Sequence, residues 1–251
     1  MKKLIFFIIC ILLLTSIMGC TPTPTNLPAF PTLPPPTNAP TQDPVLQAQG
    51  AFISVTISPY FASEGTQISV GEYSEELRTD NLQELTALAE KMSQQREILT
   101  PEQMYVLAIR FYNLGDKDTS IYWYYEAQFR ARLFQQAVEP AQMVSTNDTT
   151  FLLSSAYDSF QKLVGEYING YAGCDLDMWV KYTQMVKEDN PNPPELDQIF
   201  PDTLFVGRDQ WQTINDEVGA GLAKLSNYIS ENGTLIKQQR AQQNMDAKYC
   251  S

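Results

Sequence analysis

The sequence predicts a mainly α-helical protein made of packed antiparallel helical hairpins. Apolar residues recur at spacings of three and four through most of the chain after Asp80. Capping residues, glycines and prolines divide this part into segments of helical length. Clusters of β-branched residues over 51–58 and 66–73 instead predict a short β-hairpin or an extended segment at the start of the domain.

The first residues have the pattern of an export signal. Lys2 and Lys3 precede an apolar stretch over 4–14, and the segment ends in Ile17-Met18-Gly19-Cys20. This stretch is shorter than the roughly 20 apolar residues that span a bilayer, and its flanks are typical of a secretory signal.

The ending of this signal resembles the lipobox of bacterial lipoproteins, although Met18 is a less usual residue at its position. The resemblance implies a signal peptide over 1–19, cleavage after Gly19, and a fatty acyl anchor such as palmitate on Cys20. An ordinary cleaved signal followed by an unrelated cysteine is the alternative.

A proline-rich tether follows. Residues 21–44 hold nine of the sixteen prolines and a single charged residue, Asp43. Such a segment buries too little apolar surface to fold, and in an extended polyproline form it reaches about 75 Å at most. We therefore expect the lipidated cysteine and a disordered tether over 20–45, and a single mostly α-helical domain over 46–251.

The first helices of the domain are predicted from periodicity and caps. Leucines and other apolar residues over 82–92 make one amphipathic helix. Thr100 and Gln103 have the spacing of a capping box around Pro101, and Gly115 is placed to end that second helix. A third helix runs from about 118 to 138, so the tight turn between the last two predicts an antiparallel hairpin.

This hairpin, residues 101–134, resembles a single tetratricopeptide or Sel-type repeat. Small and aromatic residues occupy the offsets of those families, and the segment DKDTSIYWYYEAQ is similar to the Sel-type pattern. The positions in question are Ala108, Phe111, Gly115, Ser120, Tyr124 and Ala127. Since no second copy is found at a shift of 34 residues, the resemblance implies repeat-like helix packing without an array.

Further helices follow along the chain. A wide apolar stripe covers 152–168, Asp175 is placed to cap a helix over 176–186, and a three-four rhythm marks a last long helix over 211–229. The proline-rich segment 188–202 is predicted to be a loop. Gly219 and Gly221, inside the last helix, suggest close helix contact or a kink.

The aromatic run IYWYY at 121–125 places apolar side chains on opposite sides of its helix. A helix that is apolar on opposite sides is usually sandwiched between neighbours, so we expect the run to be mainly core. Tyrosines also favour the rims of binding surfaces, which makes Tyr122 and Tyr125 the candidate partner-facing residues.

Cysteine usage predicts one disulfide. Cys10 leaves with the signal and Cys20 takes the lipid, so Cys174 and Cys250 remain in the exported body. Because export exposes them to an oxidising compartment, we expect these two cysteines to pair. In the chain-entropy model, closing such a loop contributes about 4 kcal/mol.

Composition excludes several classes of function. The chain contains no histidine, which removes histidine-activated nucleophiles and histidine metal or haem sites. It has no glycine-rich phosphate loop, so we expect no cofactor and no metal. Without Lys2 and Lys3, 15 basic and 29 acidic residues leave a net charge of −14, which disfavours nucleic acid as a partner.

Carboxylate chemistry is not excluded by these arguments. Asp175 with Asp177, or Glu188 with Asp189, could act as an acid and a base or nucleophile in glycoside hydrolysis. A helix cap and a solvated charge pair account for the same residues more simply, so no catalytic residue is assigned.

The sequence therefore predicts a lipid-anchored, extracytoplasmic protein of the bacterial cell envelope. Its expected function is protein–protein interaction, as a scaffold, assembly factor or immunity-type inhibitor, with an envelope protein as partner. A carboxylate-dependent cell-wall hydrolase is the alternative.

Overall fold

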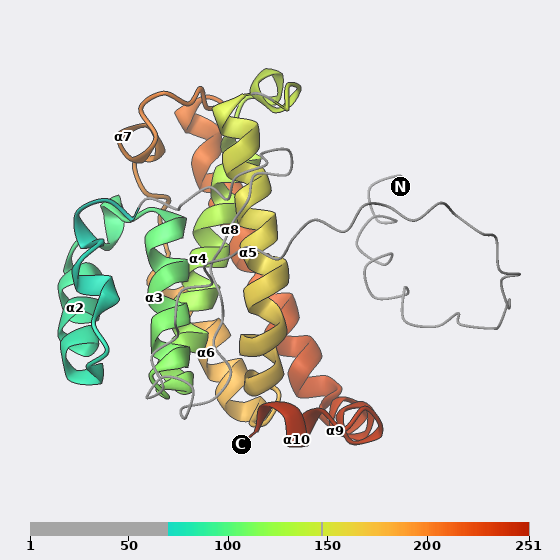
Figure 1. Cartoon of the computed structure of the whole chain (residues 1–251). Coiled ribbons are helices and arrows are strands. Elements are labelled where there is room, and N and C mark those ends of the chain that lie inside the picture. Colours follow the sequence, from blue (N-terminus) through green and yellow to red (C-terminus); the bar gives the residue numbers. More distant parts are fainter. Residues whose placement is uncertain (1–69, 147, 251) are drawn as a thin grey trace, which may run out of the picture. The chain divides into compact units, whose positions relative to one another are not determined.

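The computed structural model of the protein describes residues 70–146 and 148–250 (Figure 1). These residues are mainly α-helical, so the predicted fold class is confirmed. The α-helices are α2 (Leu82–Gln94), α3 (Pro101–Asn113), α4 (Lys117–Ala137), α5 (Thr149–Ala172), α6 (Leu176–Asp189), α7 (Leu196–Ile199), α8 (Arg208–Glu231), α9 (Gly233–Gln242) and α10 (Met245–Tyr249). Short 3-10 turns are η2 (Gly71–Tyr73), η3 (Glu76–Arg78), η4 (Arg96–Ile98) and η5 (Pro140–Met143).

Several predicted features lie outside the described residues. They are the signal peptide of 1–19, the tether of 20–45 with its Cys20, and the first predicted strand, 51–58. Only the end of the second predicted strand is described, and there Gly71–Tyr73 form a 3-10 turn in place of extended chain. Gly71 has a φ of +57°, a left-handed conformation that a strand does not use.

Helix α4 lies at the centre of the fold and packs against α3, α5, α6 and α8 (Figure 1). Its buried residues occur on every side of the helix, and Ile121, Trp123, Tyr124 and Tyr125 are all at most 3% exposed. The prediction that the aromatic run is mainly core is therefore confirmed.

The predicted hairpin forms from α3 and α4. Thr100 and Gln103 make the reciprocal hydrogen bonds of a capping box at the start of α3. Gly115 has a φ of +93° in the turn, where a side chain would be strained. The small and aromatic residues of the hairpin that resemble the repeat families are all buried: Ala108, Phe111, Ser120, Tyr124 and Ala127.

Helix α5 approaches α4 closely at Gly165. The Tyr124 hydroxyl donates to the Gln161 carbonyl at 3.1 Å, and a methyl group on Gly165 would overlap that hydroxyl. The buried face of α5 is narrower than the apolar stripe predicted over 152–168. Leu163, which belongs to that stripe, is 54% exposed.

Helices α6 and α8 pack side by side against α4. At Gly219 of α8, an added methyl group would lie 3.9 Å from the Phe129 ring of α4 and 3.6 Å from Lys187 of α6. The predicted close contact therefore holds at Gly219. It does not hold at Gly221, where no described atom would lie within 4 Å.

The predicted loop of 188–202 contains the short helix α7. After α7 the chain returns to α4, where an isolated antiparallel bridge joins Phe205 to Val138. Two further helices, α9 and α10, follow the predicted last helix and run back to the ends of α5 and α6 (Figure 1).

The close approach at Gly165 can be tested with a pair of glycine substitutions. We expect Gly165→Ala to lower the free energy of unfolding by about 1–3 kcal/mol, because the added methyl group displaces the buried Tyr124 ring. Gly221→Ala, made in open space on α8, should instead raise it by up to about 1 kcal/mol. Urea unfolding followed by circular dichroism measures both. A Gly165→Ala variant as stable as the parent protein would contradict the packing described.

Candidate functional site

The two tyrosines predicted to face a partner have different surroundings. Tyr125 is 2% exposed, its hydroxyl donates to Asn169 at 2.9 Å, and the Trp179 indole donates to that hydroxyl at 2.7 Å. Helices α5 and α6 therefore cover this face of α4. The partner-facing role predicted for Tyr125 is wrong, because its ring and its hydroxyl are both enclosed.

Tyr122 is half-buried, and its hydroxyl is hydrogen-bonded to other residues of the domain. Its hydroxyl donates to the Asp189 carboxylate at 2.6 Å and accepts from Arg96 at 2.5 Å. The Arg96 guanidinium also lies over the Tyr122 ring and pairs with Asp189 at 3.1 Å. Asp189 is thus part of an ion-paired contact between η4, α4 and α6, while its side chain stays 40% exposed to solvent.

Next to this contact, α4 carries a buried ion pair. Arg130 donates to Glu126 at 3.3 Å, and their side chains are 3% and 0% exposed. Burial raises the pKa of the Glu126 carboxyl, and the guanidinium groups of Arg130 and Arg96 oppose that shift. The pair needs further polar partners, since a desolvated charge is costly unless it is hydrogen-bonded.

Two asparagines extend the buried pair. The Asn190 amide donates to Glu126 at 2.7 Å and to the Val186 carbonyl at 2.8 Å. Asn215 of α8 in turn donates to the Asn190 backbone carbonyl at 3.0 Å. These bonds join the end of α6 to both α4 and α8, so this polar cluster has a structural role.

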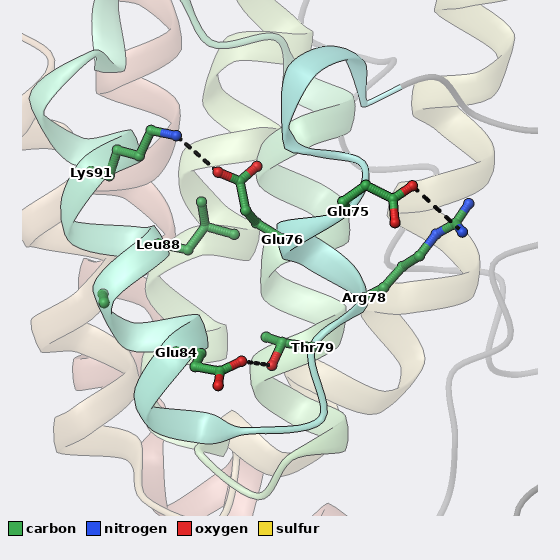
Figure 2. Close-up of a pocket in the computed structure, with 8 residues that line it drawn as sticks. Glu75, Glu76, Arg78, Thr79, Glu84, Leu88 and Lys91 are labelled. Atoms are coloured by element: carbon green, nitrogen blue, oxygen red, sulfur yellow. Dashed lines mark hydrogen bonds and ion pairs between the residues drawn. The ribbon is translucent and has the colours of Figure 1, made fainter.

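The groove between η3 and α2 is a hollow on the surface with a volume of about 720 Å³ (Figure 2). Leu88 and Ala87 of α2 supply its apolar floor. Its rim carries charged and polar side chains from both sides: Glu75, Glu76, Arg78, Thr79, Glu84 and Lys91. We call this feature the η3–α2 groove.

The charges on the rim are partly paired. Lys91 contacts Glu76 at 2.9 Å, and Arg78 contacts Glu75 at 3.8 Å (Figure 2). Glu84 accepts a hydrogen bond from Thr79. All of these charged groups remain substantially exposed, and because exposed pairs contribute little stability, they can exchange partners readily.

Helix α3 contacts the turn that borders the groove. Arg110 of α3 donates to the Thr79 carbonyl at 2.6 Å and pairs with Asp80 at 2.7 Å, which fixes the turn between η3 and α2. Tyr73 donates to Gln95 at 2.5 Å and so joins η2 to the end of α2. These contacts hold together the elements that form the groove, which the sequence pattern did not predict.

A second, smaller hollow of about 270 Å³ lies where α6, α8 and α9 meet. Its lining combines apolar residues such as Leu176 and Ile229 with the charged groups of Asp177, Glu231 and Lys237. Within residues 70–146 and 148–250, no group of three acidic or cysteine side chains is arranged to hold a metal ion.

One of the carboxylates considered for hydrolysis has another role. Asp175 caps α6 by accepting from the backbone of Asp177 at 3.1 Å and of Met178 at 3.0 Å. Burial also raises the pKa of Glu102, a residue that the sequence did not single out, and Tyr157 donates to it at 3.1 Å. Neither Glu102 nor Glu126 lines either of the two hollows.

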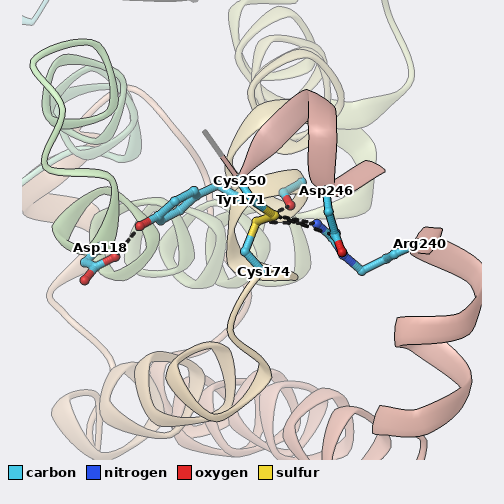
Figure 3. The surroundings of a disulfide bond; sticks show 7 residues. Asp118, Tyr171, Cys174, Arg240, Asp246 and Cys250 are labelled. Carbon is cyan, nitrogen blue, oxygen red and sulfur yellow. Dashed lines mark hydrogen bonds and ion pairs between the residues drawn. A yellow bond between two sulfur atoms is a disulfide. The ribbon is translucent and has the colours of Figure 1, made fainter. Parts of the chain in front are cut away.

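At the other end of the fold, a disulfide joins Cys174 to Cys250, with 5.7 Å between their Cα atoms (Figure 3). The ring of Tyr249 lies against Gly170 of α5, where an added methyl group would approach it to 2.7 Å. Glu166 accepts from Lys248 at 2.8 Å and from Tyr249 at 3.0 Å, and these hydrogen bonds lower the pKa of its carboxyl. We call α9, α10 and the disulfide the C-terminal clasp.

Comparison with known proteins does not assign the chain to a family. No family model matches the chain, and no solved structure matches it. A protein of Haemophilus influenzae described as "Uncharacterized protein" is 25% identical over 130 residues, which make up 50% of this chain and 47% of the relative. The chain thus spans about half the length of that relative. In the described part of the chain, no helix is both long and apolar enough to cross a membrane.

The buried ion pair can be tested by a double-mutant cycle. We expect Arg130→Met to lower the free energy of unfolding by about 3–5 kcal/mol, because it leaves Glu126 buried without its cation. Adding Glu126→Leu should restore at least part of that loss, since the uncompensated carboxylate is then removed. Urea unfolding of the parent, both single variants and the double variant measures the coupling. A double variant less stable than Arg130→Met alone would contradict this account.

Proposed function

We propose that the protein is a lipid-anchored, extracytoplasmic lipoprotein whose helical domain binds another envelope protein, as a scaffold, assembly factor or immunity-type inhibitor. The observation that carries the binding role is the η3–α2 groove, with its apolar floor and exposed charged rim. The signal-like residues 1–20, the proline-rich tether and the disulfide of the body support the extracytoplasmic location.

Charge indicates the kind of partner that fits the groove. Three carboxylates, those of Glu75, Glu76 and Glu84, share the rim with only two cations, Arg78 and Lys91. Both cations already contact a carboxylate of the rim. Because the rest of the chain is also strongly acidic, we propose a protein partner that presents a basic segment with an apolar side chain for the floor at Leu88.

A single experiment in living cells tests both the anchor and the groove. The full chain is expressed with a tag in bacteria, crosslinked, and separated into membrane and soluble fractions before proteins crosslinked to it are identified by mass spectrometry. We expect the parent to partition with membranes and to capture one abundant envelope protein. We expect Cys20→Ser to leave the membrane fraction and to incorporate no labelled palmitate, because the acylated side chain is gone.

Two matched variants of α2 test the groove. Ala87 is exposed and lines the groove, so Ala87→Arg should fill it with a charged side chain while the domain stays folded. Thr86 is exposed on the same helix outside the groove, so Thr86→Arg is the control. We expect Ala87→Arg to reduce partner capture about tenfold or more, a loss of roughly 1.4 kcal/mol, and Thr86→Arg to retain capture.

Three results would contradict the proposal. Equal capture by both α2 variants would exclude the groove as the binding site. Unchanged membrane partitioning and palmitate labelling of Cys20→Ser would exclude the lipid anchor. Clearing of a peptidoglycan zymogram by the parent, lost in Asp175→Asn, would favour the hydrolase instead.

A further inference from the structure

The disulfide of the C-terminal clasp lies in contact with a positive charge. The Arg240 guanidinium donates towards both sulfur atoms, at 3.4 Å from Cys250 Sγ and 3.5 Å from Cys174 Sγ (Figure 3). Arg240 is itself buried, with 8% of its surface exposed. The sulfur atoms of an intact disulfide are only weak hydrogen-bond acceptors and carry no charge.

The fold positions this guanidinium in a specific way. Gly173, at the end of α5, leaves the space in which it lies, since an added methyl group there would overlap its nitrogen atoms. On its other side, Arg240 donates from Nε to the Asp246 carboxylate at 2.8 Å. Gly173 therefore leaves room for the guanidinium beside the sulfur atoms, and the Asp246 carboxylate holds it there.

The two sulfur atoms differ in their surroundings. Cys250 is an exposed residue at the end of α10, whereas Cys174 is half-buried between α5 and α6. The Asp246 carboxylate lies 3.6 Å from Cys250 Sγ, and its negative charge disfavours a thiolate on that sulfur. Approach from solvent is therefore easier at Cys250, and negative charge is better tolerated on Cys174.

We propose that Cys174, Cys250 and Arg240 form a thiol–disulfide exchange site for low-molecular-weight thiols that carry anionic groups. This inference goes beyond the proposed binding function and does not depend on it. A positive charge next to a sulfur stabilises its thiolate, which makes that sulfur a better leaving group. Arg240 is the group that supplies this charge, and the same charge attracts an anionic thiol.

The exchange proceeds in two balanced steps. The incoming thiolate forms a bond to Cys250 Sγ, the Cys174–Cys250 bond breaks, and its electron pair passes to Cys174 as a thiolate beside Arg240. A second thiol molecule then displaces Cys250 from the mixed disulfide, which yields the reduced cysteine pair and the oxidised disulfide of the small thiol. The low-molecular-weight thiol is the reductant, and the protein disulfide is what is reduced.

The test compares an anionic with a cationic thiol on the purified full chain. Mercaptoethanesulfonate and cysteamine are the probes, and each rate is divided by the rate of the same thiol with a small-molecule disulfide. Reactions are stopped by alkylation and followed by intact mass, with peptide mapping to locate the mixed disulfide. For the parent protein we expect the corrected rate with mercaptoethanesulfonate to exceed that with cysteamine about fourfold or more, and the adduct to lie on Cys250.

Two variants assign the preference to the arginine. In Arg240→Gln we expect the preference to disappear and exchange with mercaptoethanesulfonate to slow by a similar factor, whereas Arg240→Lys should keep most of both. If circular dichroism shows that Arg240→Gln does not fold, the comparison of the two thiols on the parent protein still tests the proposal. Equal corrected rates on the parent, faster exchange in Arg240→Gln, or an adduct on Cys174 would each overturn the proposal.

Discussion

The burial of α4 on all of its faces is the constraint on which the rest of this structure depends. Packing against α3, α5, α6 and α8 removes Glu126 and Arg130 from solvent, so both side chains need partners inside the fold. The main partner of Glu126 outside α4 is Asn190, which comes from the end of α6. The position of α6 along α4 is thus fixed by the polar groups of α4 as well as by its aromatic ones.

This arrangement also determines where function can reside. Since the aromatic run is enclosed, a binding surface has to come from the elements at the margins of the fold. The η3–α2 groove lies on one such margin, where α2 packs against α3 and η3. The C-terminal clasp lies at another, attached to α5 by the disulfide and by the contacts of Glu166.

Local sequence signals were sufficient to predict much of the fold. Thr100, Gln103 and Gly115 define the α3–α4 hairpin because caps and turns act within a few residues of the chain. Asp175 predicts the start of α6 for the same reason. Helices α9 and α10 were not predicted, since most of their residues are polar and they carry no apolar stripe that would mark them.

The parts of the candidate site that could not be predicted depend on contacts between distant residues. Periodicity puts Tyr125 on a second apolar face of α4, but only the tertiary fold shows that Trp179 covers it. The pairing of Arg96 with Asp189 joins residues 93 positions apart. The η3–α2 groove likewise depends on the turns over 71–78, which the sequence pattern did not predict and which contacts with α2 and α3 hold in place.

Native-state amide hydrogen exchange of the intact protein tests the central role of α4 most directly. If the fold depends on this buried helix, the amides of 121–134 will exchange slowest and only through global unfolding, with the free energy that denaturant unfolding gives. The amides of α2 will exchange by local opening with a smaller free energy. Exchange of the α4 amides by local opening, as fast as those of α2, would contradict the account.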